Sequence, residues 1–233
     1  GYSIVSGIEI IKQLNGPKII SITPASNSFV SQRPTSIVIA IDENNSTLDT
    51  TAIIAAATVT RSTGAAVAGT WSIDGSNQLV FTPGNLLTED TYNVTATLKD
   101  LDGNTTPLTT SFTYDATPPA IPSVDPVTTP TNSNTQVISG SKEASASVWG
   151  NGIEAVPVDA STTWSYLVAL QPGLNTVTLF SKDRANNQSD SHSVEITYDD
   201  IAPLPVNSLT VNAADIGSVA KLDWTAYDEN VHG

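Results

Sequence analysis

A short polar segment of the sequence carries side chains that could bind a metal ion. Its oxygen-bearing residues alternate along the chain, at Asp100, Asp102 and Asn104. Further carboxylates that could complete a ligand set are Asp115, Asp199 and Asp200. Alternating oxygen ligands are typical of calcium loops, but no glutamate stands at the far end as a bidentate ligand. Because Asp-Gly-Asn is also what a tight hairpin turn requires, the pattern leaves open both a calcium site and a plain turn, and the turn is the simpler interpretation.

The histidines give no indication of catalysis. The chain has only two, His192 in an expected strand and His232 close to the C-terminus. Neither lies near a nucleophile in the sequence, and the aspartates are single turn residues rather than convergent pairs. No glycine-rich loop that could hold a phosphate occurs. The sequence therefore predicts no catalytic, cofactor-binding or metal-binding residue and no enzyme, and it predicts that His192 faces solvent.

Tryptophans raise the question of sugar binding, because flat exposed rings stack on sugars. Trp71, Trp149 and Trp164 all lie in expected strands and alternate with polar neighbours. This pattern fits a place in a hydrophobic core, which is the simpler interpretation for each. Exposure of two of the three on one face would instead indicate a carbohydrate-binding surface.

The composition excludes several classes of protein. Lys and Arg number 9 against 23 Asp and Glu, so a formal charge of −14 argues against nucleic acid as a partner. There is no cysteine, which excludes disulfides and thiolate metal sites. No apolar run approaches the length of a membrane span, and no signal peptide or Met opens the chain, so a fragment of a longer secreted protein is expected.

A repeat organises the elements that would position these residues. The strand Thr110 to Tyr114 is followed by Asp115 and prolines, and Val194 to Tyr198 is followed by Asp199 and a proline. Each copy is preceded by an Asx-rich turn, and the spacing is that of one small domain, which indicates tandem modules. The prolines end each strand ladder and stiffen the joint between modules.

Short runs rich in Val, Ile and Thr, separated by turn residues, predict strands throughout. In the first repeat we expect strands at 19–23, 36–41, 58–61, 66–73, 78–82, 92–99 and 108–114, with 51–57 open between strand and helical turn. In the second we expect them at 136–139, 146–149, 153–158, 164–169, 175–181 and 191–198, with an edge segment near 123–126. Asn151-Gly152 predicts a two-residue hairpin. The fold class is all-β, with tandem immunoglobulin-like β-sandwiches.

Sequence motifs resemble known bacterial modules. Residues 18–115 resemble bacterial immunoglobulin-like domains of surface proteins, through the segments Leu79 to Pro83, Tyr92 to Thr95 and Asp100 to Asn104. Residues 120–199 resemble a second bacterial Ig-like type, through Ile138 to Glu143, Trp149 to Gly152, Leu170 to Asn175 and Lys182 to Asn187. Residues 204–233 resemble the opening of a fibronectin type III domain, which places Trp224 in its core.

These resemblances imply the organisation and role of the chain. We expect 1–16 to end a preceding element, 17–116 and 117–203 to form two Ig-like domains, and 204–233 to begin an incomplete fibronectin-like domain. The expected role is a non-catalytic spacer in a bacterial extracellular or cell-surface protein, adhesin-like or S-layer-like, whose partners are neighbouring domains of the same polypeptide. The alternatives are a glycan- or protein-binding module and a subunit that self-associates by strand pairing.

Overall fold

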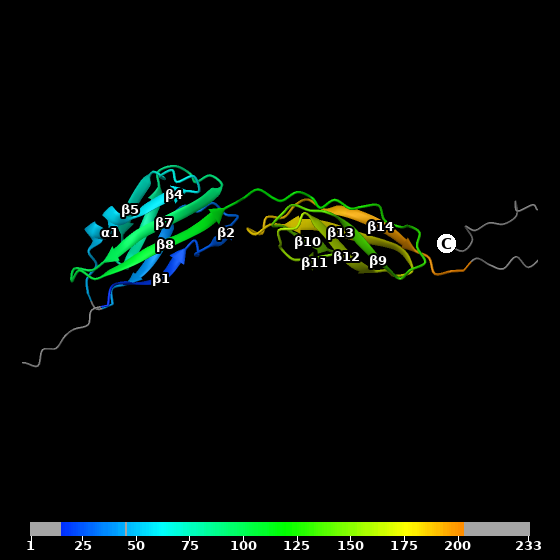
Figure 1. Cartoon of the computed structure of the whole chain (residues 1–233), viewed down its shortest axis with the longest axis horizontal. Coiled ribbons are helices and arrows are strands. Elements are labelled where there is room, and N and C mark those ends of the chain that lie inside the picture. The colour runs from blue at the N-terminus through cyan, green and yellow to red at the C-terminus, as the bar shows by residue number, and fades with distance from the viewer. Residues whose placement is uncertain (1–14, 45, 203–233) are drawn as a thin grey trace, which may run out of the picture. The chain divides into compact units, whose positions relative to one another are not determined.

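The computed structural model describes residues 15–44 and 46–202 (Figure 1). They form two compact units that divide between Pro118 and Pro119, and residues 184–187 group with the first unit. The expectations for residues 2–14, for the fibronectin-like segment 204–233, for Trp224 and for His232 lie outside the described residues. Strands dominate both units, which confirms the all-β class.

The first unit is built from two four-stranded sheets. Its strands are β1 (Lys18–Thr23), β2 (Ser28–Val30), β3 (Ile37–Asp42), β4 (Thr58–Arg61), β5 (Gly69–Ile73), β6 (Gln78–Pro83), β7 (Asp90–Lys99) and β8 (Thr105–Tyr114). One sheet has the order β1-β3-β6-β5 and the other β2-β8-β7-β4. The short β2, which the sequence did not predict, pairs in parallel with the end of β8. The remaining pairs are antiparallel.

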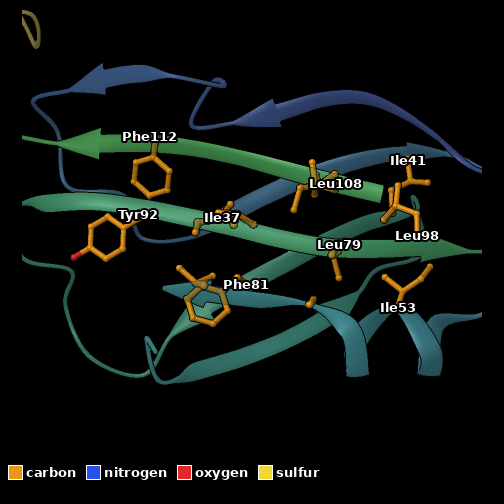
Figure 2. Packing of buried hydrophobic residues seen from close by; sticks show 14 of the residues in the cluster. Ile37, Ile41, Ile53, Leu79, Phe81, Tyr92, Leu98, Leu108 and Phe112 are labelled. Carbon is orange, nitrogen blue, oxygen red and sulfur yellow. The ribbon is translucent and has the colours of Figure 1, made fainter. Parts of the chain in front are cut away.

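Alternating apolar residues of both sheets meet in one core (Figure 2). Ile37 and Ile39 of β3 are fully buried, as are Tyr92 and Val94 of β7. The ring of Tyr92 stacks on Phe112 of β8 at 5.3 Å, and its hydroxyl donates to the backbone oxygen of Thr88 at 2.6 Å. A tyrosine that bonds back to the backbone a few residues upstream is a hallmark of immunoglobulin-like sandwiches.

The sequence left residues 51–57 open between a strand and a helical turn. The structure shows a short helix there, α1 (Thr50–Ala56). Asp49 caps it, because its carboxylate accepts from the backbone N–H of Ala52 at 3.1 Å. Ile53 points into the core of the first unit and is completely buried. The helix thus closes one end of this core, and the helical interpretation of the alanine-rich stretch is the right one.

The second unit is a smaller sandwich. Its strands are β9 (Thr135–Ser141), β10 (Ser147–Gly150), β11 (Ile153–Val156), β12 (Thr163–Ala169), β13 (Gly173–Lys182) and β14 (His192–Tyr198). One sheet has the order β11-β10-β13-β14, and β12 pairs with β9 in the other. Its core joins both sheets, with Ile138 and Trp164 on one side and Val148, Leu179 and Ile196 on the other.

Two local features of the second unit follow from particular residues. Asn151 and Gly152 adopt φ values of 49° and 80°, so the predicted hairpin between β10 and β11 is confirmed. The predicted edge segment also forms, since the N–H groups of Ser123 and Asp125 donate to Ser141 and Ser139 of β9. A Cβ atom at Gly140 would collide with the backbone oxygen of Ser123, so only glycine permits this approach.

Candidate functional site

The predicted calcium loop is the turn between β7 and β8. Asp100 directly follows β7 and is completely buried, whereas Asp102 at the tip is exposed. Gly103 adopts a φ of +90°, a conformation that favours glycine. The N–H of Asp100 donates to the backbone oxygen of Asn104 at 3.1 Å, so backbone pairing closes the turn.

Both carboxylate oxygens of Asp100 are occupied within this turn. One accepts from the backbone N–H of Asn104 at 2.7 Å, and the other accepts from the Asn104 side-chain amide at 2.8 Å. Burial alone would raise the pKa of Asp100, but hydrogen bonds from the side chain and backbone of Asn104 and from the backbone of Asp102 and Gly103 outweigh burial and lower the pKa. Because Asn104 presents its N–H₂ group to Asp100, it offers a donor where a cation would need an oxygen.

The other predicted ligands do not gather around Asp100. Asp102 accepts from the Ser46 hydroxyl at 2.7 Å. Asp115 lies beyond the other end of the ten-residue strand β8, about 30 Å away along the strand. Asp199 and Asp200 follow β14 in the second unit. Among the described residues, no group of three or more His, Cys, Asp or Glu side chains could hold a metal ion.

His192 opens β14 and is exposed, as predicted. It pairs across the sheet with Leu179 of β13.

The two tryptophans Trp71 and Trp164 support the core interpretation. Trp164 is 4% exposed and its indole N–H donates to the backbone oxygens of Ser123 and Ser141. Trp71 is partly buried against the first core, 5.0 Å from the ring of Phe81.

Trp149 lies on the outer face of its sheet, so the core interpretation is wrong for this residue. Its neighbours in β10, Val148 and Gly150, are buried, whereas its ring lies parallel to that of Phe180 at 5.9 Å. The Lys182 ammonium lies 4.5 Å from the centre of the Trp149 ring, which indicates a cation–π contact. Alternation along β10 could not show which face Trp149 occupies, because it separates the two faces of a strand without saying which one meets the core. With one of the three tryptophans outside a core, the condition for a sugar-binding face is not met.

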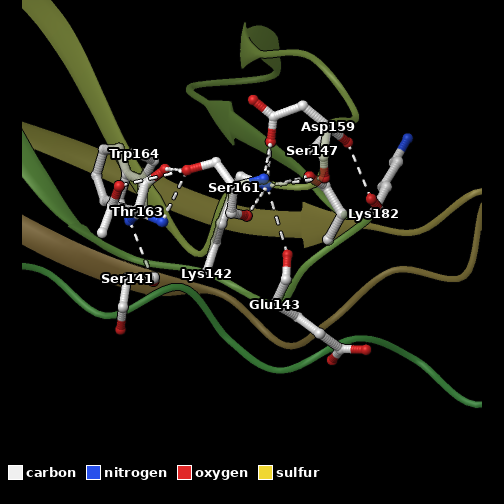
Figure 3. Close-up of polar contacts among 10 residues, drawn as sticks. Ser141, Lys142, Glu143, Ser147, Asp159, Ser161, Thr163, Trp164 and Lys182 are labelled. Carbon is white, nitrogen blue, oxygen red and sulfur yellow. Dashed lines mark hydrogen bonds and ion pairs between the residues drawn. The ribbon is translucent and has the colours of Figure 1, made fainter.

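A second buried charge, which the sequence analysis did not single out, lies in the second unit (Figure 3). Lys142 directly follows β9, and its side chain is completely buried. Its ammonium lies 2.7 Å from a carboxylate oxygen of Asp159, 2.8 Å from the backbone oxygen of Ser161 and 2.9 Å from that of Ala146. The three donors of the ammonium thus meet three oxygen acceptors at short range. Longer contacts reach the backbone oxygens of Glu143 and Asp159.

This cluster fastens two loops together. Ala146 belongs to the loop between β9 and β10, and Asp159 and Ser161 belong to the loop between β11 and β12. The N–H of Ser145 donates to the backbone oxygen of Asp159 at 2.7 Å, which ties the same loops a second time. The side-chain hydrogen bond from Lys142 outweighs burial and lowers the pKa of the Asp159 carboxyl, and the Ser161 N–H and the lysine charge add to this effect.

The chemistry available to Lys142 is limited by these contacts. A lysine attacks as a nucleophile only through the lone pair of its neutral amine. Here the side-chain nitrogen of Lys142 donates to three oxygens, so its N–H groups are all used in contacts with the protein. The cluster therefore supports structure rather than covalent catalysis. The lysine stands within the motif Ile138 to Glu143, but the loops that surround it are distant in sequence, so no local pattern could identify its acceptors.

Comparison with known proteins finds one family model that is similar to part of this chain. Residues 14–114 match the family model of the bacterial Ig-like domain. No curated protein matches the chain. No helix among the described residues is both long and apolar enough to cross a membrane.

Solved structures are similar to this chain only at low identity and with TM-scores below 0.5. Fibronectin(III)-like modules of CbhA from Clostridium thermocellum are 13% identical over 78% of this chain and 94% of theirs, with a TM-score of 0.46. The D00-D0 domain of intimin is 13% identical over 78% of this chain and 98% of its own, with a TM-score of 0.30. A tetra-tandem repeat from the extending region of a large adhesion protein is 21% identical over 78% of this chain and 48% of its own, with a TM-score of 0.30.

Proposed function

We propose that this chain is a non-catalytic structural segment that spaces or displays other parts of a bacterial extracellular or cell-surface protein. The match of residues 14–114 to the family model of the bacterial Ig-like domain supports this proposal. In this proposal 17–116 and 117–203 are successive modules, and the partners are the neighbouring domains of the same polypeptide. The resemblance of the first unit to domains of bacterial surface proteins supports the location.

One observation carries the proposal: the buried charged groups of the described residues serve the fold. The carboxylate of Asp100 is occupied by its own turn, and the ammonium of Lys142 is occupied by two loops. Groups that catalysis uses must be able to reach a substrate, whereas these face only the protein. Each unit also has a separate hydrophobic core, as a self-supporting module in a rod requires.

Limited proteolysis of the full chain tests the modular part of the proposal. A spacer of two modules should give two protected fragments with a cleavage region near Pro118 and Pro119. A protected fragment that spans this region would contradict the proposed boundary.

Replacement of both prolines with glycine should broaden the distribution of interdomain distances in small-angle scattering, because the linker loses its fixed φ angles. An unchanged scattering profile would contradict the role of the prolines as a stiff joint.

A further inference from the structure

Strand β12 is an edge of its sheet. It pairs with β9 over its whole length, from Thr163 opposite Ser141 to Ala169 opposite Thr135. The other side of β9 is covered, because Ser123 and Asp125 donate to it. Within the part of the chain that the structure describes, no strand pairs with the other side of β12.

The register fixes which backbone groups of β12 face outward. Ser139 and Ser141 of β9 accept from the covering segment, so their backbone groups point away from β12. The β12 residues opposite them therefore belong to non-hydrogen-bonded pairs and point their own N–H and C=O groups outward. The same alternation applies to Ser165, Leu167 and Ala169. Thr163 faces outward as well, but its backbone is bonded to the Ser161 hydroxyl.

This edge lacks the features that usually protect edge strands. Charged side chains, prolines and bulges commonly block pairing with another chain. The segment Thr163–Ala169 reads TWSYLVA, with no charge, no proline and no glycine. By contrast, the edge strand β11 holds only four residues, including Glu154, and the outer side of β14 is bonded to Thr131.

An exposed apolar pair lies beside the edge. Leu167 of β12 stands directly opposite Val137 of β9, and each is 60% exposed. Both side chains are on the face of the sheet that points away from the core, since Ile138 and Val168 next to them are buried. In a non-hydrogen-bonded pair the side chains lie close together, so the two form one apolar row that ends at the edge.

We propose that β12 pairs with β12 of a second copy of this chain, antiparallel and centred on Leu167. In this register Leu167 faces Leu167 of the partner copy, and Ser165 faces its Ala169. All of these are outward-facing residues, so each pair exchanges two backbone hydrogen bonds. A two-fold axis perpendicular to the sheet keeps the same face exposed on both copies, which joins the two apolar rows into one.

Symmetry favours a second copy as the occupant, and β12 is a place where the charge of the chain does not oppose one. The chain carries a formal charge of −14, so most of its surface repels another copy, but the strand that would make the contact has no charge. The two-fold axis also joins the apolar row to the same row of the second copy, because Leu167 lies at the edge with Val137 behind it. The contact is narrow, so the association belongs to the weak class of interfaces. This pairing goes beyond the spacer role and does not depend on it.

Sedimentation equilibrium of the full chain from about 10 μM to about 1 mM, the range in which weak dimers form, tests the proposal. We expect the average mass to rise toward that of a dimer. Leu167→Lys should raise the dimer dissociation constant by about tenfold or more, because two like charges then face each other across the pair. The matched control is Leu174→Lys, which adds the same charge at an equally exposed leucine, 64%, away from this edge. A monomer at every concentration, or equal effects of both variants, would overturn the proposal.

Amide hydrogen exchange gives a second, independent test. Protection of Ser165, Leu167 and Ala169 should increase with protein concentration, because their N–H groups are bonded only in the dimer. Trp164, Tyr166 and Val168 should be protected at all concentrations, since their N–H groups face β9. Ser165→Pro removes one outward donor without touching the β9 ladder and should lower the protection of Leu167 at high concentration. Concentration-independent exchange at the three outward residues would overturn the proposal even if the chain dimerises elsewhere.

Discussion

Among the described residues, each unit buries one charged group next to a strand end, and the two units stabilise it by different means. In the first unit Asp100 accepts from Asn104, which is four residues further along the chain. In the second unit Lys142 donates to Ala146, Ser161 and Asp159, and two of these partners are 17 and 19 residues away. One charge is thus satisfied inside a single turn, and the other by two loops that the fold brings together.

This difference determines what each charge contributes to stability. Removal of the Asp100 charge affects only the turn between β7 and β8. The backbone groups of this turn can still reach water at its exposed tip. Removal of the Lys142 ammonium leaves the backbone oxygen of Ala146 without its partner in a buried position, and that of Ser161 without its partner in a partly buried one. We therefore expect the second unit to depend more strongly on its buried charge than the first.

The largest effect is expected for Lys142→Met, which keeps the length and apolar stem of the side chain. The substitution should lower the free energy of unfolding of the second unit by about 1–3 kcal/mol, because the buried backbone oxygen of Ala146 and the partly buried one of Ser161 lose their hydrogen-bond donor. The measurement is urea unfolding of the full chain, followed through the methyl signals of Ile138 in the second unit and Ile39 in the first.

Asp159→Asn is the matched control for this substitution. The Asp159 side chain is 48% exposed, and Lys142 keeps its two short bonds to backbone oxygens, so the loss should be clearly smaller. The Ile39 signals should keep their unfolding midpoint in both variants. Equal losses for the two variants would show that the ion pair, rather than the backbone acceptors, holds the loops.

A smaller effect is expected for Asp100→Asn in the first unit, and it should depend on pH. The folded pKa of Asp100 is lowered from its ordinary value of 3.8, so its charge stabilises the folded state above that pH. The stabilisation is lost as the pH falls through the lower folded pKa. The unfolding midpoint of the variant should therefore lie below that of the wild type at pH 7, and the two should converge in strong acid.

Asp102→Asn serves as the control for the pH experiment, because Asp102 lies at the exposed tip of the same turn. Its unfolding midpoint, read from the Ile39 methyl signal between neutral and acidic pH, should follow that of the wild type. If the unfolding midpoints of the wild type and Asp100→Asn differed by the same amount at every pH, the stabilising effect of the turn would not depend on the charge of the Asp100 carboxylate.

The smallest effect is expected from calcium. Since the carboxylate of Asp100 already accepts two hydrogen bonds and Asn104 offers it a donor, millimolar calcium should leave the unfolding midpoint of the first unit unchanged. Calorimetric titration of the full chain should show no heat that disappears in Asp102→Ala. A calcium-dependent rise in the unfolding midpoint of the first unit, read from the Ile39 methyl signal and abolished by Asp102→Ala, would instead establish a metal site at this turn.

The sequence allowed the strands and several turns to be predicted because their signals are local. The apolar run at 36–41 was predicted as a strand and forms β3, and Asn151-Gly152 specified a hairpin through its positive φ angles. The parallel strand β2 was missed, since its three residues are too short for a periodic signal. The outer position of Trp149 was missed for a different reason: alternation separates two faces of a strand but does not say which one meets the core.

The sequence by itself thus determined the all-β class, the alternation of the strands and the local chemistry of the Asp100 turn, all of which depend on residues within a few positions of one another. Only the tertiary structure decided that Lys142 is buried among two loops, that Trp149 faces outward, and that β12 is an uncharged edge beside Val137. These features depend on which segments lie side by side after folding. Contacts between residues distant in the chain leave no spacing pattern in the sequence, because burial and pairing are set by the packing of whole sheets.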